Sequence, residues 1–187
     1  MRLTLLATLL AVVLPVRAAE PASASPGLVP AADGMELVDA ASGQAWSRCV
    51  EGMHWDGRTC QGEAALFTHA EALAMARARS EAEGRAWRVP RVPEIKQFGG
   101  RLAHTPQPAT LAPAAPAGWY WTSTVRIESE AVNPYAYRNV QRGATETQVN
   151  RLAVQVGWAV DARSGDVRGD MPKRQRLPLR LVRSLKL

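Results

Sequence analysis

The apolar and polar positions of this chain alternate in short stretches, a pattern that predicts several brief strands and hairpins. Residues 36–39 and 44–49 flank Ala-Ser-Gly, so we expect a first β-hairpin with Gly43 in its turn. Residues 152–161 alternate loosely before Ala-Arg-Ser-Gly, and residues 166–168 are expected to return as the partner strand. The same pattern favours further short strands at residues 119–125, 135–137 and 179–185.

The clearest helix is predicted to run from His69 to Glu83. Thr68 and Glu71 stand at the spacing of a capping box, in which hydroxyl and carboxylate accept hydrogen bonds from backbone N–H groups. Gly84 suits the left-handed residue that ends many helices. The expected apolar stripe is narrow and indicates close packing on a sheet; it consists of Ala70, Leu73 and Ala74.

A second, shorter helix and a long loop are expected next. The helix is predicted over residues 93–98, with Gly99 and Gly100 ending it. Residues 101–118 are rich in Pro and Ala and show neither a strand nor a helix period, which is typical of a surface loop. Residues 87–90, Trp-Arg-Val-Pro, are expected to form a short buried strand, since Pro closes it.

The first residues have the pattern of a secretory signal peptide, predicted as residues 1–18: Arg2 precedes an apolar run over residues 3–14. That run is shorter than the roughly 20 residues that span a bilayer, and no transmembrane segment is predicted elsewhere. Residues 19–34 are mostly Ala, Pro, Ser and Gly and are expected to be a flexible leader, so residues 35–187 would form one domain. Export would bring the product to the periplasm or outside the cell, where disulfides form.

The charge is distributed unevenly along the chain. The sequence has 23 Lys and Arg against 17 Asp and Glu, and residues 173–187 hold six basic side chains and no acidic one. Such a local excess favours a polyanion as ligand. The candidate ligand-binding residues are Lys173, Arg174, Arg176 and Arg180. The alternative is that Arg180 and Arg183 serve the last strand and that the other charges are only solvated.

Cys49 and Cys60 are the only cysteines, and in an exported protein they are expected to form a disulfide. The alternatives are a redox pair, which is usually Cys-x-x-Cys, or metal ligation, which needs further clustered ligands. The three His are not spaced to share one face, so no metal site or cofactor is expected. No catalytic residue is predicted either; His54 and Asp56, together in the loop between the cysteines, are the remaining candidates for an enzyme.

Four blocks of this sequence resemble, in order and spacing, the Lcl C-terminal domain family of exported bacterial domains. They are WSRCVEGMHWDGRTCQG (46–62), WRVPRVPEI (87–95), GWYWTST (118–124) and LRLVR (179–183). The resemblance implies an α+β, C-type-lectin-like fold, related to that of formylglycine-generating enzymes. One long and one short helix would pack against a twisted, mostly antiparallel sheet with long loops.

Two activities of such relatives are not expected here. Calcium-mediated sugar binding would need a Glu-Pro-Asn or Gln-Pro-Asp loop, and neither occurs. Formylglycine formation uses two cysteines late in the domain, whereas both cysteines here are early. One family member, the C-terminal domain of a collagen-like bacterial adhesin, is associated with sulfated glycosaminoglycans. This sequence has no collagen-like repeat, so the adhesin context does not carry over.

The leading hypothesis is therefore an exported, non-catalytic recognition domain that binds an anionic glycan or another polyanion. Nucleic acid is not the expected partner, because the protein is predicted to be exported and residues 173–187 lack a stacking aromatic side chain. The alternative is a structural or accessory subunit of an envelope or cell-surface assembly, which would act through contacts with an envelope protein.

Overall fold

The computed structural model describes residues 27–131, 135–141 and 148–185. The predicted signal peptide, residues 1–18, and residues 19–26 of the predicted leader lie outside the described residues. The rest of that leader is part of the fold, because Leu28 is buried and residues 29–30 pair with a strand of the first sheet.

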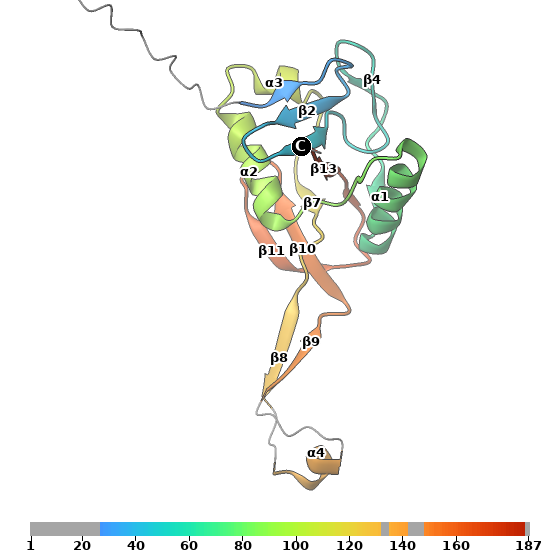
Figure 1. Ribbon diagram of the computed structural model, residues 1–187. Helices are drawn as coiled ribbons and strands as arrows, with labels where there is room; N and C mark the ends of the chain where they lie inside the picture. The colour runs from blue at the N-terminus through green and yellow to red at the C-terminus, as the bar shows by residue number, and fades with distance from the viewer. Residues whose placement is uncertain (1–26, 132–134, 142–147, 186–187) are drawn as a thin grey trace, which may run out of the picture.

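The described strands form five small antiparallel sheets instead of the single twisted sheet that the resemblance implied (Figure 1). The largest has the order β1-β2-β3-β13, with β1 Val29–Pro30, β2 Glu36–Asp39, β3 Gln44–Ser47 and β13 Val182–Ser184. A second has the order β11-β10-β7, with β7 Trp119–Trp121, β10 Val156–Asp161 and β11 Val167–Pro172. Three pairs complete the set: β4 His54–Trp55 with β5 Cys60–Gln61, β6 Leu66–Phe67 with β12 Leu177–Pro178, and β8 Ile127–Ala131 with β9 Gln148–Leu152.

The mixture of helices with mostly antiparallel strands confirms the predicted α+β class. The first hairpin is confirmed, with Gly43 at a φ of 65° in its turn. The hairpin of β10 and β11 is confirmed as well, although Leu152 belongs to β9. None of the helices in the described part of the chain combines the length and the apolar character that crossing a membrane requires.

Helix α1, His69–Glu83, has the predicted bounds. The Thr68 hydroxyl accepts from the Glu71 N–H and the Glu71 carboxylate accepts from the Thr68 N–H, while Gly84 ends the helix at a φ of 62°. The predicted stripe is right only for Leu73, which packs against the core; Ala70 and Ala74 are exposed, and Ala72 and Ala76 are buried in their place. Alanines occur around much of this helix, so their spacing does not distinguish one face from another.

Helix α2, Val92–Ala103, continues past the point where Gly99 and Gly100 were expected to end it. Phe98 is buried and Leu102, one turn later, packs against the same cluster, so burial of this face outweighs the low helix propensity of glycine. Residues 101–118 are consequently not one loop: they include the end of α2 and the short helix α3, Pro108–Leu111.

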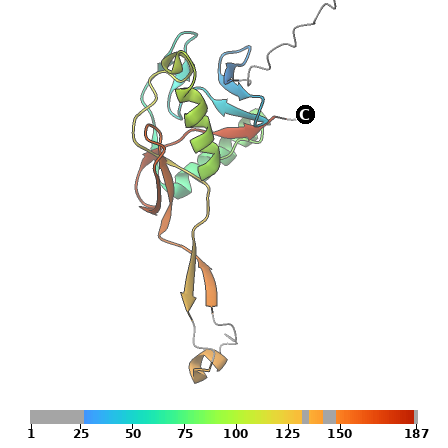
Figure 2. The same cartoon turned by 90° about the vertical axis from the view of Figure 1, so that its left-hand side faces the viewer.

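One β-ribbon was not predicted. Strands β8 and β9 project from the body of the molecule, and helix α4, Tyr137–Gln141, lies beyond them (Figures 1 and 2). The strand expected at residues 135–137 is therefore wrong, because Tyr135 lies in a turn and Tyr137 begins a helix. At the base of the ribbon the Ala153 N–H donates to the Arg126 carbonyl over 2.9 Å, which brings its two ends together.

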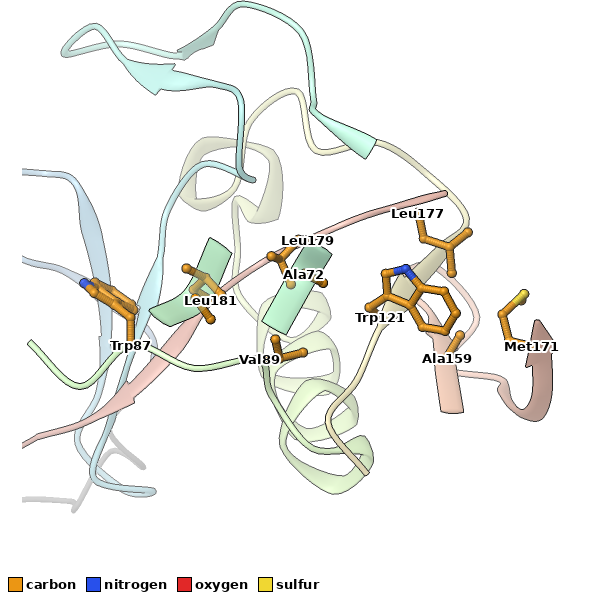
Figure 3. Close-up of a cluster of buried hydrophobic side chains, with 10 residues drawn as sticks. Ala72, Trp87, Val89, Trp121, Ala159, Met171, Leu177, Leu179 and Leu181 are labelled. Atoms are coloured by element: carbon orange, nitrogen blue, oxygen red, sulfur yellow. The ribbon is translucent and has the colours of Figure 1, made fainter. Parts of the chain in front are cut away.

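The core consists of two clusters. One gathers nonpolar side chains around Trp87 and Trp121, with Leu179 and Leu181 between them (Figure 3). Trp121 also donates its indole N–H to the Phe67 carbonyl over 2.7 Å. The other cluster contains Trp46 stacked on Phe98, with their ring centroids 4.5 Å apart. The buried Trp side chains are therefore part of the packing, as buried aromatic rings usually are.

The Cys49–Cys60 disulfide is present and closes the loop that carries β4 and β5. Replacing both cysteines with Ser is expected to lower the free energy of unfolding by about 2–3 kcal/mol, because the unfolded chain loses a crosslink. Urea denaturation measures this difference. Wild-type protein treated with a thiol reductant should unfold at the midpoint of the double variant; equal stability of oxidised wild type and variant would contradict the prediction.

Candidate functional site

The four basic residues predicted to bind a ligand do not form one surface. Arg180 is only 4% exposed, and its Nη1 donates to the carbonyls of Ser47 and Arg48. Its place on an exposed polyanion-binding face is therefore wrong, since its side chain lies inside the protein beside the Phe98 ring. Arg183 has a structural contact too, because its guanidinium pairs with the buried Glu36 carboxylate at 2.6 Å. The alternative interpretation of these two arginines is the one the structure supports.

Arg176 is exposed but already has partners at the start of α1. It donates to the Leu66 carbonyl and to the Glu71 carboxylate, each over 3.0 Å. The pKa of Glu71 is lowered, first by the hydrogen bond from the Thr68 backbone and further by Arg176. This contact joins the C-terminal part of the chain to α1 and neutralises part of the positive charge.

Lys173 lies in a cleft, which we call the basic cleft, while the neighbouring Arg174 is exposed. The cleft has a volume of about 180 Å³ and lies at the base of the projecting ribbon, where Arg126 and Ala153 belong to its lining. Its lining residues are His69, Leu73, Ser123, Thr124, Val125, Arg126, Ala153, Val156, Gly157 and Lys173.

Backbone and side-chain hydrogen bonds hold the cationic groups of the cleft in place. The Lys173 ammonium donates to the Ala153 carbonyl over 2.7 Å, and Arg126 donates to the Gly169 carbonyl over the same distance. The His69 backbone N–H donates to the Lys173 carbonyl over 3.0 Å. None of the described lining residues is acidic, although Asp170 interacts electrostatically with Arg126. Lys173 is therefore the main source of positive charge in the cleft. An anionic group is the ligand such a cleft attracts.

His69, the first residue of α1, is half-buried, and its ring meets the Trp121 ring edge-on at a centroid distance of 5.2 Å. Its pKa is lowered mainly by burial, and Lys173 lowers it further, although the Thr122 carbonyl acts in the opposite direction. The imidazole is therefore neutral at pH 7, with Nε2 positioned to donate to the Thr122 carbonyl at 3.2 Å.

The two residues considered for an enzyme have no catalytic arrangement around them. Asp56 accepts hydrogen bonds from the backbone N–H groups of Arg58 and Thr59, and these bonds lower its pKa to about 2. The carboxylate thus stabilises a turn within the disulfide loop. His54 is exposed in β4. Among the described residues, no three His, Cys, Asp or Glu side chains are grouped as a metal ion would require.

Sequence reasoning missed His69 and Arg126 as members of the cleft. They lie far from Lys173 along the chain, and only the packing of α1 against the base of the ribbon brings the three together. His69 follows the helix cap directly, which is a signal for helix formation and not for a binding site.

The model of the Lcl C-terminal domain matches residues 36–183, a range that includes the disulfide, the cleft and both core clusters apart from Leu28. This chain belongs to the Lcl C-terminal domain family. The resemblance seen in four sequence blocks is thereby confirmed. No curated protein matches this Lcl C-terminal domain.

The charge of Lys173 is expected to be measurable at His69. Because burial and Lys173 both lower the pKa of His69, NMR titration of the ring protons should give a value below 6.5, and Lys173→Gln should raise it. Arg174→Gln, which removes the same charge one residue away, is the matched control and should shift the pKa less. An equal or larger shift in the control would show that Lys173 does not lie beside the imidazole.

Proposed function

We propose that this Lcl C-terminal domain is an exported, non-catalytic recognition domain whose basic cleft binds an anionic group of an acidic or sulfated glycan. The observation that carries the proposal is that Lys173 and Arg126 line one cleft without an acidic residue among its described lining. Arg174 adjoins it in sequence and is exposed, so it extends the positive charge outside the cleft. Arg180, which is buried, is not part of this site.

The size and polarity of the cleft favour one charged substituent over a whole sugar ring. A volume of about 180 Å³ accommodates a sulfate or carboxylate group, with the rest of a chain outside. Ammonium and guanidinium groups are the donors that recognise such oxyanions in proteins. Leu73 and Val156 form an apolar wall of the cleft. The carbon skeleton next to the anionic group would lie against this wall.

Binding without catalysis is supported by what the polar groups of the cleft already do. The Ser123 hydroxyl donates to the Val89 carbonyl over 2.9 Å, and the Thr124 hydroxyl accepts from the Val92 N–H. His69 is directed to the Thr122 carbonyl. A nucleophile would need a base within hydrogen-bonding distance, and these hydroxyls point to backbone groups instead.

Export and a C-type-lectin-like fold are parts of the same proposal. The N-terminal pattern of residues 1–18 supports export, and the disulfide suits an oxidising compartment such as the periplasm or the exterior of the cell. Short antiparallel sheets packed with two main helices support the lectin-like class.

A second candidate function is that of an accessory subunit that contacts another envelope protein. Exposed large nonpolar side chains gather on the projecting ribbon, at its base and on α4, which supports a protein contact there. These side chains are Val125, Ile127, Tyr135, Tyr137, Val140 and Val154.

Heparin affinity chromatography with a salt gradient tests the leading proposal. The double variant Lys173→Gln, Arg174→Gln is expected to bind about tenfold more weakly and to elute at lower salt. The estimate assumes up to about 1 kcal/mol for each exposed charge contact, and about 1.4 kcal/mol corresponds to a factor of ten.

Arg58→Gln, Arg77→Gln is the matched control, since it removes the same charge from exposed sites outside the cleft. It should elute close to wild type. Identical elution of both double variants would refute the basic cleft as the site and favour the second candidate.

A further inference from the structure

A second cavity lies between helix α2 and the segment that leads into β7. It has a volume of about 160 Å³ and shares no lining residue with the basic cleft. Phe98 and Leu102 of α2 form one wall, and Ala115 and Ala117 belong to the facing segment. The cavity is thus mainly apolar, but two cationic residues, the buried Arg180 and the exposed Arg163, also belong to its lining.

Only one nitrogen of the Arg180 guanidinium, Nη1, donates hydrogen bonds within the described part of the protein. Nη1 donates to the Ser47 and Arg48 carbonyls at 2.5 and 2.6 Å, and the Phe98 ring lies 5.3 Å from Cζ. Nη2 and Nε donate to no group in the described part of the chain, and neither is sealed from solvent. Arg180 is 4% exposed and lines the cavity, and these two nitrogens are the ones left to bind a ligand there.

No carboxylate among the described residues forms an ion pair or a hydrogen bond with Arg180. None of the described residues that line the cavity is acidic. Glu51 acts on Arg180 electrostatically, but its carboxylate forms an ion pair with Arg79. The Tyr120 hydroxyl donates to the Pro116 carbonyl, and burial raises its pKa, so it stays neutral. A buried cation is normally paired, and here a ligand would supply the missing anion.

We propose that this cavity binds a small organic monocarboxylate with a compact apolar body. The parallel N–H groups of Nη2 and Nε match the two oxygens of a carboxylate, which guanidinium groups bind in bidentate fashion. A dry cavity of about 150 Å³ is known to hold a benzene molecule, so the observed volume suits a body of that size. The apolar part would pack against Phe98 and Leu102.

Calorimetric titration of the purified protein with benzoate tests the inference, with benzamide as the neutral analogue of the same shape. Benzoate is expected to bind, and benzamide about tenfold or more weakly, because only the carboxylate compensates the charge of Arg180. Equal binding of the two probes, or binding of neither, would overturn the proposal.

Variants at two adjacent glycines of α2 test whether benzoate binds in this cavity. Gly99 lines the cavity, and a Cβ there would meet no atom nearer than the Ala162 carbonyl oxygen at 4.0 Å. Gly99→Leu should therefore fill the cavity and abolish benzoate binding while the Arg180 hydrogen bonds stay in place. Gly100→Leu makes the same change where the Cβ meets only open space, outside this cavity, and should bind benzoate like wild type.

Two further outcomes separate this site from the basic cleft. Benzoate affinity should be unchanged in Lys173→Gln, Arg174→Gln, and it should depend weakly on salt, since buried charge pairs are screened less than exposed ones. Undiminished binding to Gly99→Leu, or loss of binding in the cleft variant, would overturn the assignment. The variant Arg180→Met should also fail to bind benzoate. Because Arg180 donates to two carbonyls, circular dichroism first checks that this variant is folded. If Arg180→Met is unfolded, the result for Gly99→Leu decides.

Discussion

The pairing of residues 177–184 with three separate parts of the chain is the constraint on which the rest of the structure depends. Leu177 pairs with Phe67, and Val182 pairs with Trp46 on one side and forms a bridge to Arg88 on the other. The side chains alternate, so that Leu177, Leu179 and Leu181 enter one core cluster and Val182 enters the other. This segment thereby joins both clusters, the two main helices and the largest sheet.

The same alternation accounts for the position of Arg180. A residue between two buried leucines must point to the opposite side of an extended segment, which here is the side of Phe98 and the second cluster. Its charge is retained there because the carbonyls of Ser47 and Arg48 accept from Nη1. Arg180 can therefore have a structural role through Nη1 and, in our proposal, a binding role through Nη2 and Nε.

Local signals predicted the elements that depend on local chemistry. The capping box at Thr68 and the glycine at 84 predicted both ends of α1, and the turn at Gly43 predicted the first hairpin. Elements governed by packing between distant residues were not predictable in this way. The continuation of α2 through Gly99 depends on burial against strands. Strand β8, Ile-Glu-Ser-Glu-Ala, alternates acidic with uncharged residues, but Ile127 is its only large apolar residue, so a hydrophobic pattern does not mark it before its pairing with β9 is known. The buried face of α1 was misassigned for the related reason that its alanines do not reveal which side meets Trp87.

The candidate sites show the same difference between what local sequence predicts and what depends on packing between distant residues. Counting charges along the sequence found Lys173, but it also grouped Arg180 with it, although one lines a surface cleft and the other is buried. Proximity along the chain is a poor guide to proximity on a surface wherever the backbone is extended, because consecutive side chains point to opposite faces.

The hydrogen bond from Ala153 to Arg126 brings together the two ends of the projecting ribbon. The free energy of closing a loop rises only slowly with its length, so a longer or shorter ribbon could be accommodated without moving the core. Arg126 and Ala153 also line the basic cleft. A change in the length of this ribbon would therefore alter what stands beside the cleft, while the residues that line the cleft keep their places.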